Sequence, residues 1–389
     1  MYHKGILTII FSALLNLFLF AQDDKSVAEA DARSLELYNN AQWKQLVAYG
    51  NEQLAAGVDF PLLRMRIGYA AFITGNYSRS LLHYKTVWDA DKSNMIALYY
   101  VYLNNLYLNN TIAARYYAAK LPPETKVSEN ITAFRISGVD GEFSYKSTDI
   151  QSRDDATYVR AGLSIQAGYR LELHQSAALF SQKLSEPALT GVSNNLHISN
   201  NQKEYYARLS YAATGKLSIL GGYHYLYTPF NNLVYNNHIG FGGIQYTSPF
   251  AHVKLMASAG NISNKSYSQF DVTLSLFPLG NTKLYTVSRV AYGNELTYSQ
   301  VVGYRIARPL WLEGNITLGK YDILLEKDAL YVYNDIDQKQ FKAGGSLYLI
   351  LSKKGLWSVN YTFDKKLRFN TINNHFFQHS LNTAITWKF

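Results

Sequence analysis

The sequence predicts an α+β multidomain chain: N-terminal α-helical repeats followed by an antiparallel transmembrane β-barrel of about 14 strands. Three observations support this prediction. The chain opens with a leader-like apolar segment, apolar residues then recur with helical spacing, and from residue 136 they alternate with polar residues to the end of the chain. Cysteine is absent, which excludes disulfide frameworks and zinc–thiolate sites.

The first 22 residues have the layout of a secretory signal peptide. Lys4 gives a charged start, residues 5–20 are apolar, and Ala21 is a small residue at the expected cleavage site. The apolar stretch is shorter than the roughly 20 residues that a membrane-spanning helix needs. We therefore expect residues 1–22 to be cleaved after export.

Basic residues are concentrated in the second half of the chain. Residues 23–125 contain ten basic and ten acidic residues, whereas residues 126–389 contain 26 and 18. No basic helix or compact Lys/Arg run accompanies this excess, so nucleic acid is not an expected partner. We expect outer-membrane lipid and lipopolysaccharide instead, contacted by loop lysines such as Lys265 and Lys327.

A period of 34 residues runs through the helical part. Small residues and aromatic residues recur at this spacing, as in the sets Ala41/Gly75/Asn109, Trp43/Tyr77/Thr111, Leu46/Ser80/Ala114 and Tyr38/Phe72/Leu106. Repeated helical hairpins bury their apolar faces by stacking on one another. A plain helical bundle that matches this period by chance is the alternative.

Consecutive prolines end the helical part. Because Pro122 and Pro123 cannot continue a helix, we expect a helical domain over residues 23–121 and a linker over residues 122–135. Four repeat tyrosines either belong to the core or line a concave groove: Tyr69, Tyr99, Tyr100 and Tyr102.

Residues 136–389 show the period of two that is typical of β-strands. In the last strand, apolar residues dominate the face of Phe377, Leu381, Ile385, Trp387 and Phe389, and polar residues dominate the other face. The predicted strands reach about ten residues, longer than those of most soluble sheets. One strand, near residues 285–292, has two mixed faces.

The connections between predicted strands alternate in length. Short ones lie near Gly215, Pro249, Gly280, Arg308 and Ser352, and long ones lie near 187–203, 229–236, 322–337 and 370–374. Short periplasmic turns and long outer loops are typical of outer-membrane barrels. With an even number of strands, the first strand begins and the last strand ends on the same side of the membrane. We expect this to be the periplasmic side, where the helical domain lies.

Because side chains alternate between the two faces of a strand, eight charged residues are predicted to face the inside of the barrel. They are Arg160, Glu204, Arg208, Asp271, Arg305, Glu313, Lys342 and Asp364. Either they line a polar channel that contacts a hydrophilic solute, or they form salt bridges with one another and fill the lumen.

The sequence contains no pattern for catalysis or metal binding. A zinc-binding His-Glu-x-x-His, a nucleophile elbow and a phosphate loop are all absent. We therefore expect no cofactor and no enzymatic activity. The alternative is a barrel enzyme acting on lipid or peptide, with a histidine near the outer rim: His224, His238 or His375.

Two family resemblances follow from these motifs. The unit of residues 67–94, with Gly75, Tyr77 and Tyr84, resembles tetratricopeptide repeats. The end of the chain, with Trp387 and Phe389, resembles the signal read by the barrel-assembly machinery. Leader, repeats and barrel together resemble YaiO-like outer-membrane proteins and, as architecture, exopolysaccharide-export barrels.

These resemblances imply an outer-membrane channel or export component, for exopolysaccharide or another hydrophilic solute. A periplasmic protein or polysaccharide would then bind the repeats. The alternative is an interaction scaffold anchored by an inert barrel. Fold-level resemblance alone does not choose between them.

Overall fold

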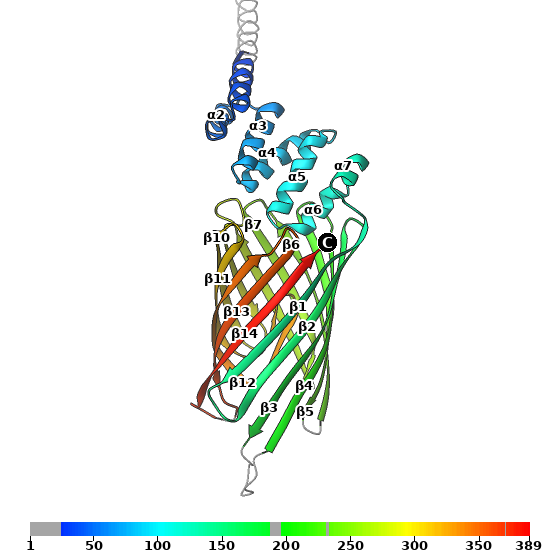
Figure 1. Ribbon diagram of the computed structural model, residues 1–389, viewed down its shortest axis with the longest axis vertical. Coiled ribbons are helices and arrows are strands. Elements are labelled where there is room, and N and C mark those ends of the chain that lie inside the picture. Colours follow the sequence, from blue (N-terminus) through cyan, green and yellow to red (C-terminus); the bar gives the residue numbers. More distant parts are fainter. Residues whose placement is uncertain (1–24, 187–195, 231–232, 370) are drawn as a thin grey trace, which may run out of the picture. The chain divides into compact units, whose positions relative to one another are not determined.

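A computed structural model describes residues 25–186, 196–230, 233–369 and 371–389 (Figure 1). The leader predicted over residues 1–22 lies outside this part of the chain. The chain divides into two compact units, one ending at Asn109 and the other spanning Asn110–Phe389. The boundary therefore places the last helices of the helical region in the same unit as the barrel.

The helical region precedes the barrel. It comprises a helix over residues 25–39 and the helices α2 Trp43–Ala55, α3 Pro61–Ile73, α4 Tyr77–Ala90, α5 Met95–Tyr107, α6 Thr111–Ala118 and α7 Pro123–Ser128. Local chemistry sets several starts: Pro61 occupies the first turn of α3, and the side chains of Asn76 and Asn94 accept backbone N–H bonds at α4 and α5. None of the described helices is both long and apolar enough to span a membrane.

The helices repeat with the predicted period. Successive starts 34 residues apart are Trp43, Tyr77 and Thr111 for α2, α4 and α6, and Pro61 and Met95 for α3 and α5. The residue at each turn also repeats: Ala41, Gly75 and Asn109 have positive φ values of 53°, 79° and 59°. The same left-handed backbone conformation therefore recurs every 34 residues, together with the repeating side chains.

Small residues let the helices of the first unit pack closely. A Cβ atom on Gly68 would lie 2.9 Å from Cε2 of Tyr84, and one on Gly50 would lie 2.4 Å from the Ile67 side chain. Of the four repeat tyrosines, Tyr102 is buried, and the remaining three (Tyr69, Tyr99 and Tyr100) are half-buried in a chain of ring contacts. Those three are neither fully core nor fully exposed.

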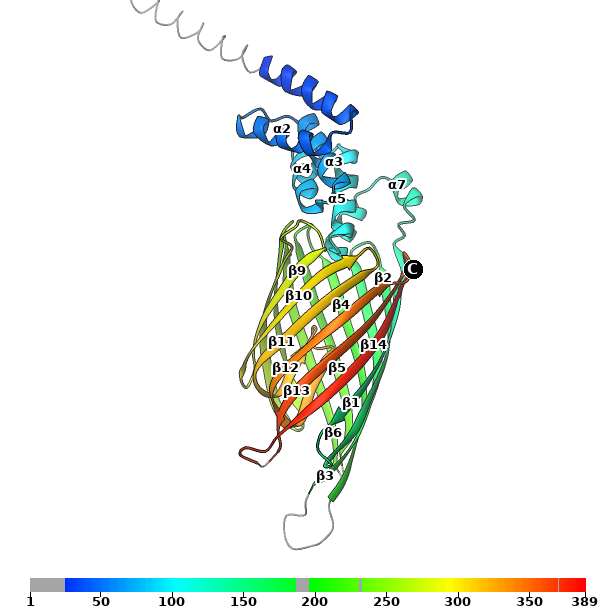
Figure 2. The same ribbon diagram turned by 60° about the vertical axis from the view of Figure 1, so that its left-hand side comes forward.

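Fourteen antiparallel strands follow and close into a barrel (Figures 1 and 2). They are β1 Phe134–Thr148, β2 Arg153–Ala167, β3 Leu171–Glu186, β4 Leu196–Ala212, β5 Leu217–Phe230, β6 Leu233–Thr247, β7 Ala251–Ile262, β8 Lys265–Leu276, β9 Leu284–Tyr292, β10 Leu296–Ala307, β11 Leu310–Glu326, β12 Tyr331–Ile350, β13 Gly355–Leu367 and β14 His375–Lys388. Each strand pairs with its sequence neighbour, and β1 closes the wall against β14. The predicted strand number and the antiparallel order are confirmed.

The outer face of the wall is apolar and the inner face is polar. On β14, Phe377, Leu381 and Ile385 are 37%, 53% and 49% exposed, whereas the intervening Gln378 and Ser380 are 4% and 7% exposed. A ring of exposed apolar side chains around a whole barrel far exceeds the patches that water-soluble proteins tolerate. The wall is therefore a membrane-spanning barrel of the outer-membrane type.

The barrel has two ends, which we call the near end and the far end. The near end is where β1 begins and β14 finishes, and the far end carries turns such as Ser263–Asn264. At the near end, the stretch predicted as a linker contains α7, and β1 begins at Phe134 rather than at residue 136.

Two connections predicted as long are wrong. Pro229 pairs with Val234 and Phe230 with Leu233, so β5 and β6 leave only residues 231–232 between them. The stretch 322–337 is mostly strand as well, because β11 extends to Glu326 and β12 starts at Tyr331. This second hairpin determines what fills the barrel.

Candidate functional site

A hairpin of the chain leaves the barrel wall and folds into the lumen. The pairing of β11 with β10 ends at Leu318, and the pairing of β12 with β13 begins at Gln338. Residues 319–337 are therefore not part of the closed wall, and we call them the inner hairpin. Its two arms pair mainly with each other, as Ile323 does with Asn334.

Gly319 allows the inner hairpin to leave the wall. Its φ is +123°, in a region that side-chain-bearing residues rarely adopt. A Cβ atom at this position would also lie 2.6 Å from the carbonyl oxygen of Leu296 and 3.1 Å from Cα of Thr297. Glycine is thus required both for the bend and for the close passage over β10.

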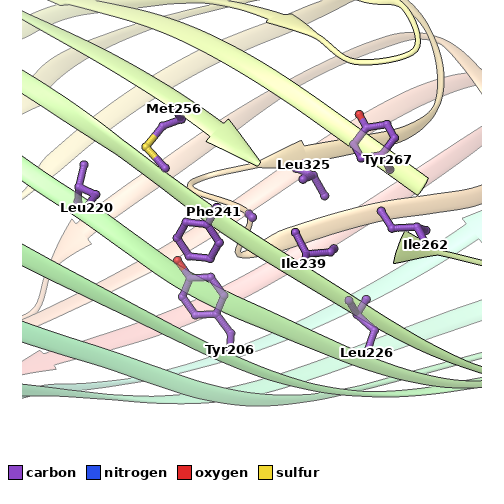
Figure 3. Packing of buried hydrophobic residues seen from close by; sticks show 10 residues of the cluster. Tyr206, Leu220, Leu226, Ile239, Phe241, Met256, Ile262, Tyr267 and Leu325 are labelled. Atoms are coloured by element: carbon purple, nitrogen blue, oxygen red, sulfur yellow. The ribbon is translucent and has the colours of Figure 1, made fainter. Parts of the chain in front are cut away.

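The tip of the inner hairpin packs into an apolar cluster on the inside of the barrel (Figure 3). Leu325 and Ala329 of the hairpin are 1% and 3% exposed. The wall residues of this cluster come from β4 to β8: Tyr206, Leu220, Leu226, Ile239, Phe241, Met256, Ile262 and Tyr267. Inward-facing apolar residues on five neighbouring strands are unusual for a water-filled lumen, and here they form a seat for the hairpin.

Polar wall side chains hold the hairpin backbone. Gln269 donates from Nε2 to the Leu325 carbonyl at 2.9 Å and accepts from the Leu325 N–H at 3.0 Å. The Tyr206 hydroxyl donates to the Asp328 carbonyl at 3.0 Å, and His224 Nδ1 lies 2.7 Å from the Ala329 carbonyl oxygen. These bonds satisfy backbone groups that would otherwise be buried without partners.

Ion pairs join the hairpin to the wall at several heights. Asp337 accepts two bonds from the Arg153 guanidinium, at 2.6 and 2.8 Å. Asp328 lies 3.1 Å from Arg208 and also pairs with Lys254.

Two further acids of the hairpin also meet wall lysines. Glu326 lies 3.0 Å from Lys342, and Asp335 lies 3.3 Å from Lys366 and 3.5 Å from Lys339. Of these pairs, Arg153–Asp337 is buried on both sides, with side chains 2% and 6% exposed, so removing either partner would leave an unpaired buried charge. The other pairs are partly exposed.

A cavity of about 720 Å³ remains in the lumen beside the hairpin. Its lining combines apolar side chains with many polar and charged ones, among them Arg160, Glu313, Asn360 and Asn382. Nine basic and nine acidic side chains line it in total, so the occupied lumen carries no net formal charge. A space of this size accommodates a small hydrophilic solute.

Helix α6 packs against the barrel unit at the near end. Ile112 packs against the apolar cluster of the lumen, and Arg115 forms an ion pair with Glu172 at the start of β3. The ring of Tyr117 lies so close to Gly215 that a Cβ atom there would be 2.0 Å from the Tyr117 hydroxyl. The near end is thus partly covered by a helix, while the hairpin enters from the far end.

The eight charged residues predicted to face the lumen take different partners. Arg160 pairs with Asp140 and Glu142, Arg208 with Asp328, Asp271 with Arg289, Lys342 with Glu326, Asp364 with Lys339, Glu204 with His224, and Glu313 accepts from Tyr285; Arg305 bonds to carbonyls of the near-end turn and stacks on Trp311. Their partners are other residues rather than one another, and six of the eight also line the cavity.

The residues that hold the inner hairpin inside the lumen were not identified from the sequence. Arg153 lies beside a strand irregularity that breaks the parity rule, and Asp328, Asp335 and Asp337 lie in a stretch predicted to be an outer loop. The prediction for Lys327 was wrong for the same reason: its amine lies over the Tyr331 ring and lines the cavity, away from lipid.

Three barrel histidines whose side chains the structure describes, His174, His224 and His238, are not arranged for catalysis. His224 is completely buried and holds the hairpin, and His238 contacts the Tyr223 hydroxyl at 2.6 Å on the outer face. His174 has Ser164 Oγ at 2.9 Å and Asp140 Oδ1 at 3.9 Å, but both approach the same Nδ1 atom. A Ser–His–Asp triad needs them on opposite ring nitrogens. The part of the chain that the structure describes contains no cluster of three or more potential metal ligands.

Comparisons with solved structures find channels and transporters among the matches. No family model and no curated protein matches the chain. A TodX deletion mutant, titled a monoaromatic hydrocarbon channel, matches with a TM-score of 0.47 and 11% identity over 70% of this chain and 94% of its own. The CymD monoaromatic hydrocarbon channel gives 0.45 and 9% over 70% and 91%. The Ralstonia pickettii toluene transporter TbuX gives 0.44 and 9% over 66% and 90%.

At these scores and identities the likeness carries no argument about function. The barrel itself is established by its strand pairing. No match supports the tetratricopeptide or YaiO-like resemblance, and both stay predictions.

Proposed function

We propose that the chain is an outer-membrane channel for hydrophilic solutes, with a lumen that the inner hairpin closes at rest. The observation that carries the proposal is the 720 Å³ cavity beside a segment that is bonded to the wall but is not part of it.

The contacts between the inner hairpin and the wall favour a hairpin that can leave the lumen over one that fills it permanently. Many of its contacts are ion pairs and hydrogen bonds, which water and solute ions can replace. Two apolar clusters, one at the tip and one that includes Leu324, hold the rest of it. Since the wall closes through β10–β11 and β12–β13 pairing without the hairpin, the hairpin can leave while the barrel stays intact.

Conductance in planar bilayers tests this proposal. In one variant, residues 321–337 are replaced by a short Gly-Ser linker that reconnects β11 and β12. We expect the full chain to show rare openings and the variant to show a steady open current. A variant that inserts as a folded barrel and passes no current would refute the channel.

The helical region would serve export by binding a partner below the barrel. The 34-residue spacing of helix starts and the half-buried rings of Tyr69 and Tyr100 favour tetratricopeptide-like repeats with an aromatic binding surface. In this proposal the near end faces the periplasm, residues 1–22 are a signal peptide, and the barrel-assembly machinery reads Trp387 and Phe389. Exopolysaccharide is one candidate cargo among hydrophilic polymers.

An anchored interaction scaffold is the second candidate function. The extensive pairing of lumen charges favours it, because a filled barrel needs no transport role. Pull-down with the detergent-solubilised full chain and with the linker variant discriminates the two. Partners that bind both proteins equally, combined with no current from either, would favour the scaffold.

A further inference from the structure

The charges of the lumen are divided unevenly between the wall and the inner hairpin. Among the residues that line the cavity, the wall contributes eight basic and five acidic side chains, and the hairpin contributes one basic and four acidic. The neutrality of the closed lumen thus depends on the hairpin. With the hairpin removed, the wall alone carries an excess of three positive charges.

The acidic residues of the hairpin also form ion pairs with basic residues of the wall. Each one of the four (Glu326, Asp328, Asp335 and Asp337) forms at least one ion pair with a wall lysine or arginine. The wall acids, by contrast, satisfy other wall groups, as Asp271 does with Arg289 and Glu142 with Arg160. Apart from Lys339, which Asp335 shares with the wall acid Asp364, the wall lysines that the hairpin binds therefore form no ion pair with a wall acid in the described part of the chain.

The geometry of the Arg153–Asp337 pair indicates which chemical groups these cations can bind. Both carboxylate oxygens are engaged, by Nε at 2.6 Å and by Nη2 at 2.8 Å, and both side chains are almost fully buried. This fork-to-fork geometry recognises carboxylate or phosphate groups and offers little to an uncharged solute.

We propose that the basic lumen wall is a binding track for anionic solutes, carboxylate- or phosphate-bearing, and that the inner hairpin occupies this track as an internal competitor. The inference rests on the proposed channel and names its substrate class. An anion that enters the cavity competes with the carboxylates of the hairpin for the same cations. Binding of cargo and displacement of the hairpin are then one coupled event.

The geometry gives the track a direction. Asp337 and Asp335 lie toward the far end, where the hairpin leaves the wall, and Asp328 at the tip pairs with Lys254, close to the near-end start of β7. An extended hairpin arm of this length covers on the order of 25–30 Å at roughly 3.3 Å per residue. The cations it meets are thus spread along most of the barrel, as a polyanion would require.

Reversal potentials in a KCl gradient test the track. In the linker variant lacking residues 321–337, we expect chloride to be favoured over potassium by about threefold or more. Adding Lys342→Met and Lys366→Met to that variant should abolish most of the preference. Lys203→Met is the matched control and should leave the preference unchanged, because Lys203 is exposed on the outer face of β4 between the lining residues Gln202 and Glu204.

A second variant keeps the whole chain. Asp328→Asn with Asp337→Asn retains the hairpin and removes two of its anchoring charges, and it should open more often with the same anion preference. Tripolyphosphate and oligogalacturonate added to the bath distinguish phosphate from carboxylate recognition by which of them blocks the current.

The outcomes separate this inference from the proposed function. A conducting linker variant without anion preference would overturn the track and leave the channel standing. For a variant without current, calorimetry on the detergent-solubilised protein decides: tripolyphosphate binding that the lysine substitutions weaken about tenfold would support the track and refute the channel. No current and no binding would overturn both.

Discussion

Arg153 at the start of β2 and Asp337 of the inner hairpin form a two-bond ion pair across 184 positions of sequence. Asp337 also accepts from the Phe369 N–H at 2.9 Å, beyond the end of β13. A single carboxylate thereby joins the hairpin to two separate parts of the far end. This contact is one of the ion pairs that hold the hairpin inside the lumen, and it is the one buried on both sides.

The substitution Asp337→Asn should release the hairpin. It removes the charge that pairs with the buried Arg153 guanidinium, and breaking one partner of a buried pair costs about 3–5 kcal/mol. Trypsin cleavage after Lys327 measures the release, because this residue is inside the lumen while the hairpin is closed. We expect cleavage to accelerate by about a hundredfold or more.

A conservative change on the same hairpin provides the control. Asp322 is exposed and accepts a hydrogen bond from the backbone N–H of its neighbour Ile323. Asp322→Asn should leave the cleavage rate unchanged. Equal rates in both variants would mean that the Arg153–Asp337 pair does not hold the hairpin.

The substitution Gly319→Ala should strain the backbone at the point where the inner hairpin leaves the wall. The positive φ and the 2.6 Å approach to the Leu296 carbonyl together predict a loss of about 1–3 kcal/mol. The temperature at which the barrel unfolds on an SDS gel should fall. Gly314→Ala is the control, because a Cβ atom there meets nothing within 4 Å; equal temperatures for the two variants would contradict the requirement for glycine at 319.

The outward face of β8 should not accept charge. Val272 faces lipid, and arginine on the lipid face near the middle of the membrane costs about 2–4 kcal/mol. Its neighbour Thr273 lines the cavity, so Thr273→Arg should be better tolerated. Folding yield into lipid vesicles measures both. Equal yields would contradict the assignment of the two faces.

Acid should weaken the helical unit through His83. Burial lowers the pKa of this histidine to about 4, with Arg64 and Arg79 acting in the same direction and Asp59 opposing them. The unfolded chain then binds the proton more readily between about pH 6.5 and 4. The free energy of unfolding should therefore be highest above pH 7 and fall by on the order of 2–3 kcal/mol as the pH drops through this range.

Helix melting followed by circular dichroism of the full chain checks this dependence. Acidic side chains titrate in the same range, so the informative quantity is the difference between the full chain and His83→Leu. We expect the variant to lose less stability on acidification. Parallel curves would exclude His83 as the titrating group.

The wall of the barrel could be predicted from sequence because its two faces meet different solvents. On β14 the alternation of Phe377 and Leu381 with Gln378 and Ser380 encodes lipid on one side and the lumen on the other. The ambiguous strand β9 shows the limit of this rule: Val287 faces inward and Ser288 outward, so neither face has a clear polarity.

The inner hairpin could not be predicted, because its composition also suits an outer loop. Asp328, Asp335 and Asp337 suggest solvent exposure, and only their distant partners show that they are buried. A weaker signal was present in the two short apolar runs, 323–325 and 331–333, around a Lys-Asp turn. That pattern predicts a strand hairpin, although not where it packs.

A reversible disulfide between the wall and the inner hairpin tests the closing role most directly. Ser263 at the far-end turn and Asn334 of the hairpin are hydrogen-bonded at 3.1 Å, and the chain has no native cysteine. In bilayers, oxidised Ser263→Cys/Asn334→Cys should pass almost no current, and reduction should restore openings. An oxidised protein that conducts as well as the reduced one would show that the pathway does not require the hairpin to move.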